Sequence, residues 1–177
     1  MKKLFAIVTG SLFVSVILIS CRPTTKDAIK YNDALVEQRS KVIEKENALI
    51  EAISKNMPEK LDLLYSEMKK QIEESIDSVN QMKGFGGKTD MKDAAMKFLI
   101  TYKEVAGNEY KEMLKYAKMP DTLYTQEEDD IVMDLNKKID DKLNKVDNDF
   151  IQMQKVFAEK YKFEPSAVME EPLGKKK

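Results

Sequence analysis

The chain has 177 residues, no histidine and a single cysteine, and its 30 basic and 31 acidic residues nearly cancel. The lack of histidine excludes the usual imidazole acid–base catalysis and the Glu-x-x-His metal sites of helical bundles. The balanced charge argues against nucleic-acid binding, which requires a basic face. We therefore predict no catalytic, metal-binding or cofactor-binding residues and no nucleic-acid partner.

Residues 1–20 have the composition of a secretory signal. Lys2 and Lys3 precede an uncharged run from Leu4 to Ser20, and this basic-then-apolar order is typical of such signals. The alternative is an uncleaved membrane anchor, because a run of this length lies at the lower limit of what spans a bilayer. The residue that follows the run, Cys21, favours the signal.

The tetrapeptide Leu18-Ile19-Ser20-Cys21 resembles the lipobox of bacterial lipoproteins. The resemblance implies that diacylglycerol is attached to the Cys21 thiol and that residues 1–20 are removed. Residues 21–24 would then be the lipidated cysteine and a short linker. Several acyl chains hold a protein durably on a membrane, so the resemblance also implies stable attachment.

The residues after Cys21 bear on localisation. No acidic residue directly follows Cys21. In this respect the sequence resembles lipoproteins that are delivered to the outer membrane of cells with two membranes. Arg22-Pro23 also lacks the acidic cluster that some bacteria use as a surface-export signal. We therefore expect the bacterial cell envelope, with an outer-membrane position facing the periplasm favoured over the cell surface.

Four long segments rich in helix-forming residues follow, separated by proline and glycine. The first, residues 25–54, is capped by Thr24 or Thr25. It carries apolar doublets seven residues apart, which predict one buried stripe: Ala28/Ile29, Leu35/Val36, Val42/Ile43 and Leu49/Ile50. The second helix is expected over 58–83, the third over 90–118 with Asp90 as its cap, and the fourth from the capping box of Thr125 and Glu128 to about Tyr161.

The connections between these helices are short, so consecutive helices should lie antiparallel beside each other. We predict an all-α fold, an up-down-up-down antiparallel four-helix bundle over residues 25–161, followed by a disordered polar tail over 162–177. The alternative is a longer coiled-coil assembly made by dimerisation. We expect a monomer or a weak homo-oligomer.

Three polar residues of the first helix, Asn32, Arg39 and Glu46, lie seven apart beside the apolar doublets. One hypothesis is that they line a polar cleft that binds an anionic or hydrogen-bonding ligand. The other is that they form the rim of a helix contact, with Arg39 reaching a carboxylate on a neighbouring helix. A buried arginine requires a partner in either case.

Two loops are further candidates. Phe85 lies among glycines at the end of the bundle that carries the lipid, where it either contacts the membrane or folds back to cap the core. At the opposite end, two connections bring apolar residues together, and these either bind a partner protein or seal the bundle. This distal tip consists of Met57, Met119, Leu123 and Tyr124.

These features predict a non-enzymatic, membrane-anchored cell-envelope lipoprotein. The diacylglycerol on Cys21 would attach the protein to the membrane. The helical part would serve as an interaction module for an unidentified protein of the envelope. The alternative function is a carrier of a small apolar or amphipathic ligand held between the helices beside Asn32 and Arg39. A carrier predicts a cavity of about 300 Å³ or more.

Overall fold

The computed structural model describes residues 23–165, and these residues are almost entirely helical. The one strand-like feature among them is an isolated bridge between Phe85 and Lys88. The all-helical prediction is therefore confirmed. Cys21 and the predicted signal lie outside the described residues, as does the tail from residue 166 onward.

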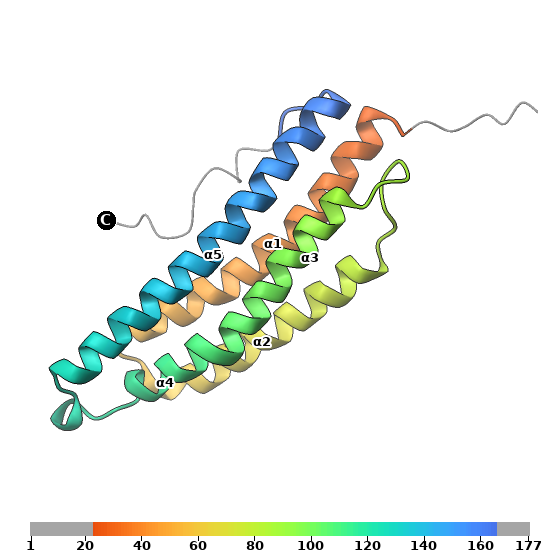
Figure 1. Ribbon diagram of the computed structural model, residues 1–177. Helices are drawn as coiled ribbons and strands as arrows, with labels where there is room; N and C mark the ends of the chain where they lie inside the picture. The colour runs from red at the N-terminus through yellow and green to blue at the C-terminus, as the bar shows by residue number, and fades with distance from the viewer. Residues whose placement is uncertain (1–22, 166–177) are drawn as a thin grey trace, which may run out of the picture.

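Four helical rods make up the described part of the chain (Figure 1). The elements are α1 (Thr25–Ser54), α2 (Pro58–Gln81), α3 (Asp90–Val105), the π-helix η1 (Ala106–Tyr110), α4 (Lys111–Ala117), the 3₁₀-helix η2 (Asp121–Leu123) and α5 (Gln126–Tyr161). Because α3, η1 and α4 follow one another without a break, they form a single rod, which we call the third rod.

The rods pack side by side, and the chain turns back at each connection between them (Figure 1). The contacts join α1 to α2, α2 to α3 and α3 to α5, and α1 also touches both α3 and α5. The start of α1, the Phe85 loop and the end of α5 therefore meet at one end of the domain. The α1–α2 turn and η2 lie at the other end, which we call the distal end.

The helix ends follow the capping chemistry in the sequence, with one exception. Thr24 caps α1 in a capping box with Asp27, and Thr125 caps α5 in the same way with Glu128, as expected. Asp90 is not the cap of α3, because the helix already begins at that residue. The residue at the cap position is Thr89, and its hydroxyl donates a hydrogen bond to Asp93 Oδ2 at 2.7 Å.

The first residue of each apolar doublet of α1 is fully buried, whereas the second is either partly buried against the core, as Val36 and Ile43 are, or exposed. Ala28, Leu35, Val42 and Leu49 are fully buried, whereas Ile29 and Ile50 are 37% and 44% exposed. The buried arc of the helix extends instead toward Asn32, Arg39 and Glu46, which lie closer to the first residue of each doublet around the helix than the second residue does. The polar column therefore occupies the interior position that the sequence pattern assigned to the second apolar residue.

Ordered structure continues beyond the predicted end of the fourth helix. Lys162 takes a left-handed conformation with φ of 58°, which ends α5 and turns the chain back. The backbone N–H of Phe163 then donates to the carbonyl of Ala158 at 3.1 Å, and its ring packs edge-on against Phe157 with centroids 6.1 Å apart. Residues 162 and 163 thus belong to the folded domain and not to the polar tail.

Candidate functional site

The three polar residues singled out in the first helix lie in the interior of the domain. Asn32, Arg39 and Glu46 are 1%, 5% and 2% exposed, so the structure brings them to one buried seam. Their spacing of seven residues is close to two helical turns, and each therefore lies one layer further along the same side of α1. We call this column, together with the side chains that bond to it, the polar seam.

Arg39 is held by a carboxylate of α5. Its Nε and Nη2 atoms both lie 2.6 Å from Asp147 Oδ1, and its guanidinium sits 5.7 Å from the centroid of the Phe98 ring. Asp147 is 1% exposed. Burial raises the pKa of the Asp147 carboxyl, while the positive charge of Arg39 opposes that rise. The pair matches the interpretation in which Arg39 finds a carboxylate on a neighbouring helix.

Glu46 is held by two tyrosines of the third rod. The hydroxyl of Tyr102 donates to Oε2 at 2.8 Å, and that of Tyr110 donates to Oε1 at 2.6 Å. Both tyrosines are themselves buried. Loss of solvation raises the pKa of the Glu46 carboxyl, and the two hydroxyl bonds only partly oppose it. Burial of the two tyrosines raises the pKa of both hydroxyls well above the ordinary value, and the negative charge of Glu46 raises it further.

The π-helix explains how both tyrosines reach one carboxylate. At 3.6 residues per turn, residues eight apart in an α-helix point about 80° away from each other. The wider turn of η1 takes up one extra residue, so the spacing from Tyr102 to Tyr110 becomes equivalent to two full turns. The hydroxyl of Tyr65 donates to the carbonyl of Ala106 at 2.8 Å, which satisfies an acceptor at the start of this wide turn.

Sequence reasoning missed Tyr110, because a regular α-helical period places it off the core face of the third helix. The only sequence signal for the irregular turn is Gly107, the single glycine inside a helical pattern. Asp147 was missed for a related reason, since its neighbours Asn148 and Asp149 make the whole run resemble a solvated helix face.

Asn32, the remaining residue of the column, has an incomplete set of hydrogen-bond partners. Asn32 Nδ2 donates to Asp33 Oδ1 at 3.2 Å, but its buried Oδ1 has no partner among the described residues. Gln154, 1% exposed, likewise has an unpaired Nε2 within the described part of the chain. Because α1 and α5 run in opposite directions (Figure 1), seven-residue steps from the Arg39–Asp147 pair place Asn32 and Gln154 at one level of the seam.

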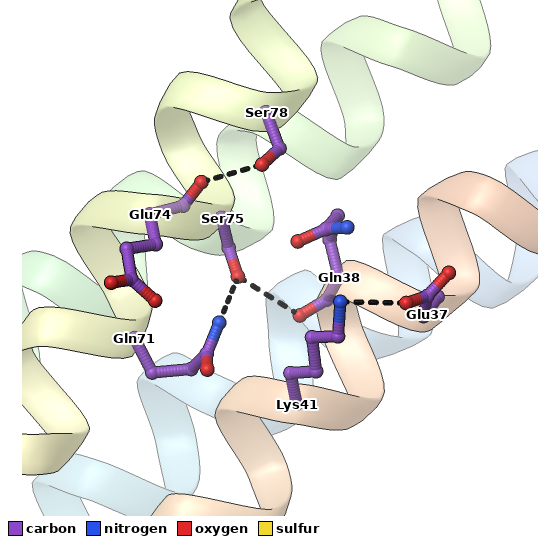
Figure 2. A network of polar contacts seen from close by, with 7 residues as sticks. All are labelled: Glu37, Gln38, Lys41, Gln71, Glu74, Ser75 and Ser78. Atoms are coloured by element: carbon purple, nitrogen blue, oxygen red, sulfur yellow. Dashed lines mark hydrogen bonds and ion pairs between the residues drawn. The ribbon is translucent and has the colours of Figure 1, made fainter.

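A smaller polar contact joins α1 to α2 (Figure 2). Ser75, fully buried on α2, donates to the backbone carbonyl of Gln38 at 3.4 Å and accepts from Gln71 Nε2 at 3.1 Å. The ion pair between Lys41 and Glu37, which Figure 2 also shows, stays on the surface of α1. Ser75 is thus a satisfied polar residue in an apolar seam.

The structure places Phe85 over the end of the core. Its ring lies 5.1 Å from that of Tyr31, 5.4 Å from Phe157 and 5.0 Å from Tyr161, measured between centroids. Gly86, with φ of +58°, allows the turn that folds the ring inward. These contacts match the interpretation in which Phe85 caps the core. The packing gives no support to the other interpretation, in which this ring contacts the membrane.

The residues of the predicted distal tip divide into two kinds. Met57 packs against the core and so helps to seal the end of the domain, while Met119 is half-buried. Leu123 and Tyr124 are 63% and 36% exposed at η2 and the residue after it. The tip therefore keeps an apolar surface made of Leu123 and Tyr124, and its other two members are less exposed.

The comparisons with known proteins add no functional residue. Neither a protein-family model, nor a curated protein, nor a solved structure matches this chain.

Within residues 23–165, no group of three or more histidine, cysteine, aspartate or glutamate side chains is arranged to hold a metal ion. In the same part of the chain, no helix combines the length and the apolar composition needed to cross a bilayer.

Proposed function

We propose that this chain is a non-enzymatic cell-envelope lipoprotein, anchored through diacylglycerol on Cys21, whose helical domain binds another envelope protein. The lipobox-like Leu18-Ile19-Ser20-Cys21 supports the anchor. We also propose that the four rods form an up-down-up-down antiparallel bundle. The reversal of the chain at each connection and the packing of neighbouring rods support that topology.

The observation that carries the interaction role is the exposed pair Leu123 and Tyr124 at the distal end. The described chain begins at residue 23, next to the proposed anchor, and this point lies at the opposite end of the domain (Figure 1). A tethered domain of this shape would present the two residues away from the bilayer. Large exposed apolar side chains gathered at one place are typical of contact sites between proteins.

The charge of the segment that carries Leu123 and Tyr124 indicates the chemistry of the partner. Residues 119–136 contain six acidic residues and no lysine or arginine. A partner that matches this surface would offer an apolar pocket bordered by basic side chains, because complementary charge speeds association and suppresses wrong partners. Contacts of this kind weaken with added salt, since the charges are exposed and screened.

Photo-crosslinking in the native envelope tests the proposal. A photoreactive residue at position 124 should give one crosslinked partner, and Leu123→Ser or about 0.5 M salt during capture should remove it. Val156→Ser is a matched control, because Val156 is 59% exposed on α5 near the other end of the domain. An identical crosslink in the Leu123→Ser variant would contradict a role for the tip.

One observation favours the carrier function as a second candidate. An open groove of about 450 Å³ lies between α3 and α5, with Ala94, Met153 and Val156 among its lining residues. It is large enough for a small ligand, but its lining does not include Asn32, Arg39 or Glu46. An environment-sensitive apolar dye whose binding is lost in Val156→Ser and kept in Leu123→Ser would support the carrier over the interaction module.

A further inference from the structure

Glu46 is a buried carboxylate without a cation. It is 2% exposed, and among the described residues its two oxygens accept hydrogen bonds only from neutral phenolic hydroxyls, those of Tyr102 and Tyr110. Within residues 23–165, no lysine or arginine forms an ion pair or hydrogen bond with it. Ionisation of a carboxyl in such surroundings costs free energy, because the two tyrosine hydroxyls replace only part of the solvation that water would give the charge.

The charged groups around Glu46 increase this cost. On α5, the carboxylates of Asp140 and Asp147 both repel negative charge on Glu46. Arg39, the cation one layer away on the same side of α1, is committed to Asp147. A second cation, Lys142 of α5, is bonded to Glu109 of η1 at 2.6 Å.

The residues that face α2 do not supply a cation for Glu46 either. There, Lys45 of α1 pairs with Glu67 at the surface at 2.9 Å, and Tyr65 donates its hydroxyl to the carbonyl of Ala106. Among the described residues, the groups shown to act on Glu46 are thus two neutral hydroxyls and the carboxylates of Asp140 and Asp147.

We propose that the Glu46 carboxyl is a buried proton-binding site, and that its proton fastens α1 to the third rod. A protonated carboxyl donates one hydrogen bond and accepts others. A tyrosine hydroxyl also both donates and accepts, so the pair of tyrosines satisfies the neutral acid through the same short contacts. When the proton leaves, the site holds an unpaired charge, and the contact between α1 and the third rod weakens.

The direction of the pH dependence follows from this arrangement. Burial raises the pKa of Glu46 above its ordinary value of 4.5, so the folded chain keeps the proton at pH values where the unfolded chain has lost it. The contribution to stability is fully present below pH 4.5 and is lost as pH rises through the raised pKa. Within that window, the unfolding equilibrium constant increases by up to about tenfold for each pH unit.

Urea unfolding of the purified full chain between about pH 4.5 and pH 8 tests the proposal. Glu46→Gln keeps the shape and the hydrogen-bonding groups but has no proton to lose, so its stability should fall less with rising pH than that of the wild type. Glu44→Gln is the matched control, because it removes the same charge at an exposed position of the same helix. Asp147 is present in all three proteins, so the pH dependence that remains in Glu46→Gln includes its titration.

A second measurement uses the wild-type chain and therefore does not require the Glu46→Gln variant to fold. The carboxyl ¹³C shift of Glu46 in the labelled wild-type chain should titrate above the ordinary glutamate pKa of 4.5. A Glu46 carboxyl that titrates at or below 4.5, or a Glu46→Gln protein with the wild-type pH dependence, would overturn the proposal.

Discussion

Replacing Arg39 by methionine is expected to lower the free energy of unfolding by about 3–5 kcal/mol. The variant removes the 2.6 Å ion pair and leaves Asp147, 1% exposed, as an uncompensated charge. It also removes the contact of the guanidinium with the Phe98 ring, which adds on the order of 1 kcal/mol. Methionine fills a similar volume, so little of the loss should come from a cavity.

The double variant Arg39→Met/Asp147→Leu separates the ion pair from the packing. With both charges gone, apolar side chains replace the ion pair at this level of the polar seam, and buried ion pairs replaced in this way cost little or even stabilise. We expect the double variant to be more stable than either single variant, with a coupling energy of at least about 2 kcal/mol.

Lys97→Met is the matched control. The pair of Lys97 and Asp149 likewise ends on α5 and joins it to α3 at 2.7 Å, but its side chains are 57% and 48% exposed. Its loss should cost no more than about 1 kcal/mol. Urea unfolding followed by helical circular dichroism measures all of these values. Equal losses in Arg39→Met and Lys97→Met, or single losses that simply add in the double variant, would refute the reasoning.

Three further changes test other parts of the structure by the same unfolding assay. Tyr110→Phe removes one hydroxyl from the buried carboxylate and should cost about 1–3 kcal/mol, whereas Tyr116→Phe, half-buried on α4, should change stability by less than about 0.5 kcal/mol. Gly107→Ala adds a methyl group in open space on a helix and should stabilise by about 1 kcal/mol; Gly86→Ala, at φ of +58° and 3.0 Å from a tyrosine hydroxyl, should destabilise by about 1–2 kcal/mol. Thr125→Ala removes the cap of α5 and should cost about 1 kcal/mol, and a change below about 0.3 kcal/mol would contradict the capping role.

The sequence predicts the helices well because their signals are local. The bounds of α1 agree with the prediction at both ends, and α5 agrees at its capping box, since Thr24 and Thr125 each meet an acidic residue three positions later. α2 ends at Gln81, two residues before the expected end, because Met82 is already extended. These boundaries depend on neighbours within one turn, which the sequence displays directly.

The polar seam is harder to predict because it depends on contacts between distant residues. The seven-residue spacing identified Asn32, Arg39 and Glu46, but the partners of Arg39 and Glu46 lie 108 and up to 64 residues away. Tyr110 reaches Glu46 only through the π turn, which no periodic pattern indicates. The lipid anchor depends on Cys21, outside the described residues, and remains a prediction from the tetrapeptide.

The anchor is tested most directly by the intact mass of the protein expressed in a bacterial host. We predict a mature chain that begins at Cys21 and carries the added mass of diacylglycerol, and a Cys21→Ser variant without that mass. A wild-type product that retains residues 1–20, or that begins at Cys21 with a free thiol, would contradict the proposed lipoprotein.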